Sequence, residues 1–133
     1  QTVANLNQYD AALMARLNIV TDAWFHITKR GGFFGVHNYP MASWSGVYCV
    51  SSGQNDIDQP DSGKLSFINP MAQMYLDSGN SQLQMPYHLG NYALNLQAGQ
   101  LVIFPSWVVH QVMPFYGEGE RITVAFNCSM LFK

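Results

Sequence analysis

The sequence has few charged residues and no excess of either sign. Only 11% of its residues are charged, with six Lys and Arg against eight Asp and Glu. Because no basic stripe is present to meet a phosphate backbone, we expect no direct nucleic-acid partner. Hydrophobic residues make up 48% of the chain, which favours a packed globule over a disordered segment. A length of 133 residues predicts a single domain over residues 1–133.

Cysteines and long apolar runs are also scarce. Cys49 and Cys128 stand in apolar, strand-like runs and lack the C-x-x-C spacing of a metal or redox motif, so we interpret them as buried thiols in a reducing compartment. No apolar run approaches the roughly 20 residues that span a bilayer, and the start has no signal-peptide pattern. We therefore expect a soluble, cytoplasmic protein without membrane association.

The hydrophobic periodicity predicts one helix followed by short strands. Leu6, Leu13 and Leu17 are spaced as on one helix face, which predicts a helix over about residues 5–20. The expected strands cover residues 24–28, 33–39, 46–50, 64–68, 92–96, 100–104, 108–113 and 121–127. Eight short strands separated by turn residues predict an all-β jelly roll or small barrel over about residues 23–128. Exposed strand edges in such a fold would favour a homodimer.

Two histidines on separate predicted strands indicate a metal site. His37 and Tyr39 are two apart, so they project from the same face of a strand, and His110 follows Gly99 and Pro105 on a distant strand. Non-haem iron is usually held by two histidines and one carboxylate on one face. A single strand histidine is more often structural, but the pair favours metal binding.

Arg121 and Thr123 are also two apart on a predicted strand. A guanidinium beside a hydroxyl suits the carboxylate of a small dicarboxylic acid. The alternative is a structural ion pair of Arg121 with Glu118 or Glu120, because an unpaired buried charge is costly.

Three segments carry a family resemblance: Ser45-Gly-Val-Tyr48, Phe104-Pro-Ser-Trp-x-x-His110 and Arg121-Ile-x-Val-Ala-Phe-Asn127. With them, the stretch from Trp24 to Asn127 resembles the 2-oxoglutarate- and Fe(II)-dependent oxygenases of marine bacteria and phages. The resemblance implies a cupin-like double-stranded β-helix and an oxidoreductase of the dioxygenase type that uses Fe(II) and 2-oxoglutarate.

The resemblance also implies roles for individual residues. His37 and His110 would hold the iron, and Arg121, assisted by Thr123, would bind the distal carboxylate of 2-oxoglutarate. Tyr48 is a further candidate on the cosubstrate side. Candidates for lining the substrate side are Trp44, Trp107, Asn127 and the loop over residues 70–90. Whether the substrate is a small molecule or a peptide does not follow from fold and cofactor motifs.

The sequence departs from the family pattern at Tyr39, where an acid or a second histidine is usual. A neutral phenol is a poor ligand for Fe(II). Three interpretations stay open: a two-histidine site completed by water or a distant acid, a tyrosinate ligand, and a domain that has lost catalysis. The distant acids are Asp56, Asp58 and Asp61.

An alternative from another class is a cupin-like domain that binds a metal or small ligand without oxidising it. The spacing from Gly99 to His110 resembles the second cupin motif. No glutamate lies between His37 and Gly63, where the first cupin motif needs one, and the Arg121-x-Thr123 pair has no role in a cupin. A structural domain is the third interpretation, favoured if His37 and His110 lie far apart.

Overall fold

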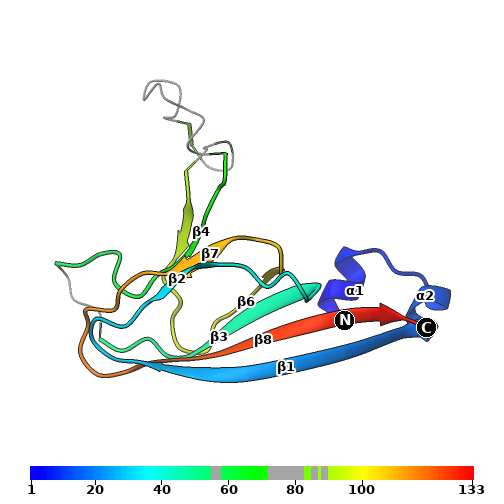
Figure 1. The fold of residues 1–133 in the computed structure, drawn as a ribbon, viewed down its shortest axis with the longest axis horizontal. Coiled ribbons are helices and arrows are strands. Elements are labelled where there is room, and N and C mark those ends of the chain that lie inside the picture. Colours follow the sequence, from blue (N-terminus) through cyan, green and yellow to red (C-terminus); the bar gives the residue numbers. More distant parts are fainter. Residues whose placement is uncertain (55–57, 72–82, 85–86, 88–89) are drawn as a thin grey trace.

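Two four-stranded antiparallel sheets lie face to face (Figure 1). The structure is a computed structural model that describes residues 1–54, 58–71, 83–84, 87 and 90–133. One sheet has the strand order β1-β8-β3-β6 and the other has the order β2-β7-β4-β5. Successive strands cross from one sheet to the other, except from β4 to β5, which is the winding of a double-stranded β-helix. The expected all-β, jelly-roll fold class is confirmed.

All eight predicted strands are present, with different ends. They are β1 (Leu17–Thr28), β2 (Phe34–His37), β3 (Trp44–Ser51), β4 (Leu65–Phe67), β5 (Tyr92–Leu94), β6 (Leu101–Pro105), β7 (His110–Val112) and β8 (Arg121–Phe132). The largest differences are the early start of β1 and the late end of β8. These two strands extend beyond the sandwich toward the helices and the chain termini (Figure 1).

The single helix expected over residues 5–20 does not form. Two short helices take its place, α1 (Thr2–Leu6) and α2 (Ala11–Arg16). Between them Gln8 has a φ of 55°, and the Asp10 carboxylate starts α2 by accepting from the Leu13 N–H at 2.8 Å. The last part of the expected helix, from Leu17 onward, pairs with β8 instead. Cross-strand pairing of β-branched residues therefore outweighs the helical spacing.

The twelve-residue ladder between β1 and β8 sets up the inner face of the larger sheet. Directly opposite residues of an antiparallel pair share a face, and every second residue along each strand returns to it. The opposed pairs on the inner face are Thr28 with Arg121, His26 with Thr123, Trp24 with Ala125, Asp22 with Asn127 and Val20 with Ser129. This row of side chains faces the smaller sheet.

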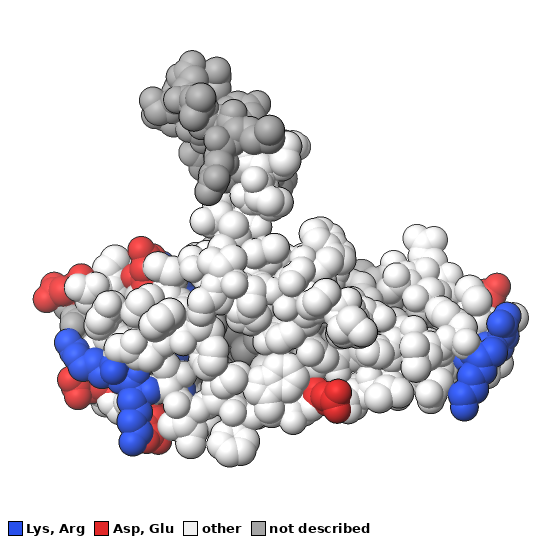
Figure 2. Space-filling view, in the orientation of Figure 1, with Lys and Arg blue, Asp and Glu red and all other residues white. Residues whose placement is uncertain are grey.

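The core between the sheets is built on aromatic and aliphatic side chains. Leu65 and Phe115 are fully buried, and Phe104 packs edge-on against Phe67 with ring centroids 5.0 Å apart. Cys49 is buried as a free thiol, and Cys128 is also free. Most charged side chains on the face seen in Figure 2 lie toward its two ends, and an acidic side chain lies between them at the lower edge. Neither helix in the described part of the chain is long and apolar enough to cross a membrane.

Gly117 is a position where the packing forbids a side chain. A Cβ there would lie 2.0 Å from the backbone oxygen of Gln54 and 2.7 Å from the Phe115 ring. We expect Gly117→Ala to lower the free energy of unfolding by about 1–3 kcal/mol through overpacking. Urea denaturation followed by tryptophan fluorescence measures this change.

The matched control is Gly35→Ala, because nothing lies within 4 Å of the Cβ that this change adds. We expect its stability to be unchanged or slightly raised, since alanine restricts the unfolded chain more than glycine does. Equal stability losses in the two variants would contradict the packing described around Gly117.

Candidate metal and cosubstrate site

His37 and His110 meet because they are directly opposed across two strands. His37 ends β2 and His110 begins β7, and the two are partners in the antiparallel register. Opposed residues project from the same face, so the two rings lie side by side with centroids 4.3 Å apart. The fold therefore brings together two imidazoles that are far apart in the sequence, as the metal-site interpretation requires.

Each of these histidines is held by a backbone carbonyl two residues before it. The Nδ1 of His37 lies 2.6 Å from the Gly35 oxygen, and the Nδ1 of His110 lies 2.9 Å from the Val108 oxygen. A carbonyl only accepts, so Nδ1 carries the hydrogen and Nε2 keeps its lone pair in both neutral rings. Fixing the ring and tautomer in this way prepares an imidazole for metal ligation through Nε2.

The surroundings of His110 keep its ring neutral and fixed. Only 2% of the residue is exposed, and the Phe104 ring packs against it with centroids 4.9 Å apart. Burial lowers the pKa of His110, partly offset by its hydrogen bond to Val108. A neutral imidazole is the form that binds metal.

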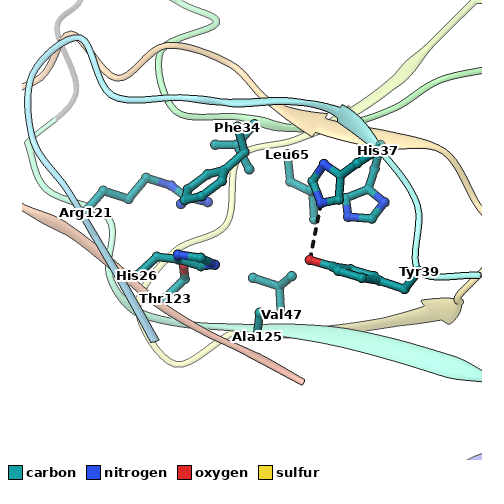
Figure 3. A pocket seen from close by; sticks show the side chains of 11 residues that line it. His26, Phe34, His37, Tyr39, Val47, Leu65, Arg121, Thr123 and Ala125 are labelled. Atoms are coloured by element: carbon teal, nitrogen blue, oxygen red, sulfur yellow. Dashed lines mark hydrogen bonds between the residues drawn. The ribbon is translucent and has the colours of Figure 1, made fainter. Parts of the chain in front are cut away.

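Tyr39 lies beside both histidines. Its hydroxyl oxygen is 3.2 Å from the His37 Nε2, and its ring centroid is 5.3 Å from that of His110 (Figure 3). The backbone N–H of Tyr39 donates to the Ser106 oxygen, and the Trp24 ring packs edge-on against the phenol. Burial raises the pKa of Tyr39, so the hydroxyl stays protonated and donates to the free Nε2 of His37.

Arg121 is a buried cation without a partner among the described residues. Only 4% of it is exposed, and its guanidinium makes no ion pair or hydrogen bond with any residue that the structure describes. Glu120 pairs with Lys29 at 3.7 Å and Glu118 with Arg30 at 3.8 Å, so the expected alternative of a structural ion pair is not what the structure shows. Burial lowers the pKa of Arg121, because removing the charged guanidinium from water costs free energy.

One cavity between the sheets joins Arg121 to the histidine pair. Its lining residues are His26, Phe34, His37, Tyr39, Val47, Leu65, His110, Val112, Arg121, Thr123 and Ala125 (Figure 3). The free volume is about 30 Å³, close to the share of one water molecule in the liquid, so a dicarboxylic acid fits only after lining side chains move. The sequence-predicted set of His37, His110, Arg121 and Thr123 therefore shares one space.

His26 is a lining residue that the sequence analysis missed. The Trp24 Nε1–H donates to its Nε2 at 2.8 Å, and its ring lies 4.2 Å from that of Phe34, centroid to centroid. Burial lowers the pKa of His26, and the charges of Arg121 and His37 lower it further. His26 lies opposite Thr123 because of the register between β1 and β8. Alternation along one strand does not predict which residue of another strand lies opposite, so the sequence analysis missed it.

The remaining candidates lie elsewhere. Tyr48 alternates with Val47, which lines the cavity, so Tyr48 is on the opposite face of β3 and 40% exposed. Trp44 shares that outer face by the same alternation, and Trp107 is 72% exposed. Asn127 is outside this cavity; its Oδ1 accepts a 2.7 Å hydrogen bond from Ser45.

Comparison with protein families identifies the chain. The model of the family described as "Putative 2OG-Fe(II) oxygenase" matches residues 22–127, which is most of its length. The chain belongs to this family. The match includes every residue that lines the cavity, from His26 to Ala125. A search of curated proteins found no match.

Solved structures of other oxygenases have the same fold. A 2OG-Fe(II) oxygenase family oxidoreductase from Burkholderia pseudomallei has a TM-score of 0.57 at 13% identity, over 86% of this chain and 46% of that one. A prolyl-4-hydroxylase from Pseudomonas putida has a TM-score of 0.54 at 22% identity, over 96% and 62%. HygX from Streptomyces hygroscopicus, solved with nickel and 2-oxoglutarate, has a TM-score of 0.57 at 11% identity, over 96% and 66%. The chain thus spans about half to two thirds of the length of these structures.

The chain lacks a carboxylate beside its histidine pair in the part that the structure describes. No group of three or more His, Cys, Asp or Glu side chains is placed there to hold a metal. Of the acids expected from the sequence, Asp61 is exposed and pairs with Lys64 at 2.9 Å, and Asp58 is exposed. Asp56 lies outside the described residues, as does most of the loop over residues 70–90.

The lowered pKa values of His26 and His110 predict how stability depends on pH. The ordinary pKa of histidine is 6.5, so below pH 6.5 the unfolded chain takes up protons that the folded chain does not bind. The free energy of unfolding should therefore be highest above pH 6.5 and fall as the pH drops from about 7.5 to 5.5. Urea titrations at several pH values measure the slope.

The neutral variant His110→Gln removes one of these titrating groups. We expect a flatter dependence of stability on pH in this variant than in the parent chain. An unchanged slope in both His110→Gln and His26→Gln would show that the two imidazoles are not kept neutral by burial.

Proposed function

We propose that this chain oxidises an organic substrate with Fe(II), 2-oxoglutarate and dioxygen. The observation that carries the proposal is the buried guanidinium of Arg121, which no described residue pairs, in the same cavity as the His37 and His110 rings. A buried cation of this kind is stabilised by an anionic ligand, and two preset imidazoles are suited to a transition metal. Family membership supports assigning iron and 2-oxoglutarate to these two features.

The Nε2 atoms of His37 and His110 would hold the metal. Both rings present an unprotonated nitrogen, so binding needs no loss of a ring proton. Bound Fe(II) with 2-oxoglutarate and dioxygen supplies the oxidising power for attack on a C–H bond, as in the related oxygenases. The protein's own contribution is to fix the ligand rings and to exclude water with the surrounding aromatic side chains.

Arg121, Thr123 and His26 would bind the cosubstrate. The guanidinium pairs with the distal carboxylate, and the buried Thr123 hydroxyl is available as a second donor. In neutral His26 the bond from Trp24 occupies Nε2, so its hydrogen is on Nδ1, a third donor. Together these groups offer hydrogen bonds to an anion where no protein anion competes among the described residues.

The test is an anaerobic titration of the chain with Fe(II) and 2-oxoglutarate, followed by the visible charge-transfer band of the chelate. We expect a saturable band in the parent chain, and its loss in His110→Ala and in Arg121→Ala at matched concentrations. Arg30→Ala is the matched control, because Arg30 is exposed and outside the cavity. Far-UV circular dichroism shows whether each variant is folded.

Absence of the band in the folded parent chain at saturating iron would contradict the proposal. The second candidate is then a cupin-like domain that binds metal or a small ligand without oxidation, which is favoured because no described carboxylate joins the histidine pair. Calorimetric binding of metal without any effect of 2-oxoglutarate would identify that case.

We further propose that Tyr39 stays protonated and is not a ligand: its hydroxyl releases the His37 Nε2 when the metal binds, so that the protein supplies two nitrogen ligands. Tyr39→Phe should then bind Fe(II) with less than about a threefold change in affinity, because the phenyl ring keeps the packing against Trp24. Tyr39→Asp places a carboxylate two residues after His37, on the same face, and should strengthen binding by about tenfold or more through a complete facial triad. Competition with a fluorescent chelator measures both affinities.

Loss of Fe(II) binding in Tyr39→Phe, with folding intact, would show instead that the phenol oxygen is a ligand.

The two free cysteines support a reducing location, and we propose that the protein is in the cytoplasm. The expected homodimer stays a prediction.

A further inference from the structure

A second cavity adjoins the histidine pair at Tyr39. It has a volume of about 250 Å³. Its lining residues are Val20, Asp22, Tyr39, Pro40, Met41, Ala42, Asn127 and Ser129. Tyr39 lines this cavity and the first one, so a single phenol separates the new space from the two imidazoles.

The two cavities occupy opposite parts of the same inner face. Along β8, Arg121, Thr123 and Ala125 line the first cavity, whereas Asn127 and Ser129 line the second. The six-residue step from Arg121 to Asn127 corresponds to about 20 Å of strand. The anion anchor is therefore at one end of the row, and the second cavity is toward the other. A substrate in this cavity would reach the histidine pair from the side away from the cosubstrate.

Asp22 is the one charged residue that lines the second cavity. It lies on β1 directly opposite Asn127, and it is exposed. Its carboxylate forms no ion pair or hydrogen bond with any residue of the described ranges. The row of inner-face side chains thus carries a cation, Arg121, near one end and an anion, Asp22, toward the other, and neither is paired by a residue that the structure describes.

The other lining groups narrow the chemistry of a ligand. Val20, Pro40, Met41 and Ala42 offer apolar contact. The Asn127 Oδ1 already accepts from Ser45, which leaves its amide hydrogens as donors. A positively charged group in this cavity would bind most strongly to the Asp22 carboxylate, because charge-assisted hydrogen bonds are stronger than neutral ones.

We propose that this second cavity binds the oxygenase substrate and that the substrate carries a primary amine or guanidinium on an aliphatic stem. The cationic group pairs with Asp22, and the stem lies on the apolar side chains beside Met41. This assignment rests on the proposed function, since it takes the histidine pair as the metal site. The same chemistry is offered by a free alkylamine and by a lysine or arginine side chain of a peptide.

The test is a titration of the ¹⁵N-labelled full chain with small probes, followed by the NMR shifts of the Asn127 side-chain amide and the Met41 and Ala42 backbone amides. The probes are 1,5-diaminopentane, Nα-acetyl-lysine methylamide and, as a neutral molecule of the same length, 1,5-pentanediol. We expect saturable shifts with one or both cationic probes and none with the diol. Response to the diamine alone indicates a free amine, and response to the lysine derivative alone indicates a peptide side chain.

Asp22→Asn removes the charge at nearly constant shape and should weaken binding of the cationic probe by about fivefold, the effect of an exposed ion pair. Asp10→Asn is the matched control, since it removes the same charge from a helix cap where asparagine also caps well. Its affinity should equal that of the parent chain.

Unchanged affinity in Asp22→Asn, equal binding of the diol, or no saturable shift with either cationic probe would overturn the inference. The Fe(II) and 2-oxoglutarate band is recorded on the same samples. An intact band without amine binding therefore contradicts only the substrate assignment, whereas a missing band contradicts the proposed function itself.

Discussion

The burial of a guanidinium without a counter-ion in the described ranges is the constraint on which the site depends. Arg121 begins β8 and is held in place by pairing with Thr28, so its charge cannot leave the space between the sheets without breaking the ladder. Desolvating a charge is costly, and the glutamates nearest in sequence pair with other cations. An anion that binds only the folded chain would offset this cost and stabilise the fold by mass action.

In the histidine pair, backbone hydrogen bonds fix the position and the tautomer of both rings. The register of β2 and β7 sets the separation of the two rings, and the carbonyls of Gly35 and Val108 set their tautomers. Neither the register nor these two carbonyl hydrogen bonds involve the side chain at position 39. The fold can therefore keep two nitrogen donors side by side although position 39 holds a tyrosine and not a carboxylate.

Much of the architecture could be predicted from the sequence because strand alternation has a short, strict period. Strand alternation placed His37, His110, Arg121 and Thr123 on inner faces. The structure brings these four side chains to one cavity. The prediction of one helix over residues 5–20 was wrong. Leu17 and its neighbours pair with β8, and a pairing between segments so far apart in the sequence cannot be read from local spacing. His26 was missed for the same reason. Tyr48 was chosen by resemblance alone, although alternation from Val47 places it on the outer face.

The measurement that tests the central claim most directly is the ring nitrogen spectrum of the histidines, recorded by long-range ¹H–¹⁵N NMR before and after addition of Zn(II) as a diamagnetic metal. The account predicts that His37 and His110 carry their proton on Nδ1 in the metal-free chain and that only their Nε2 signals move strongly when metal binds, with His26 little affected. Nε2-protonated rings, or Zn(II) shifts at neither His37 nor His110, would contradict a metal site at this pair.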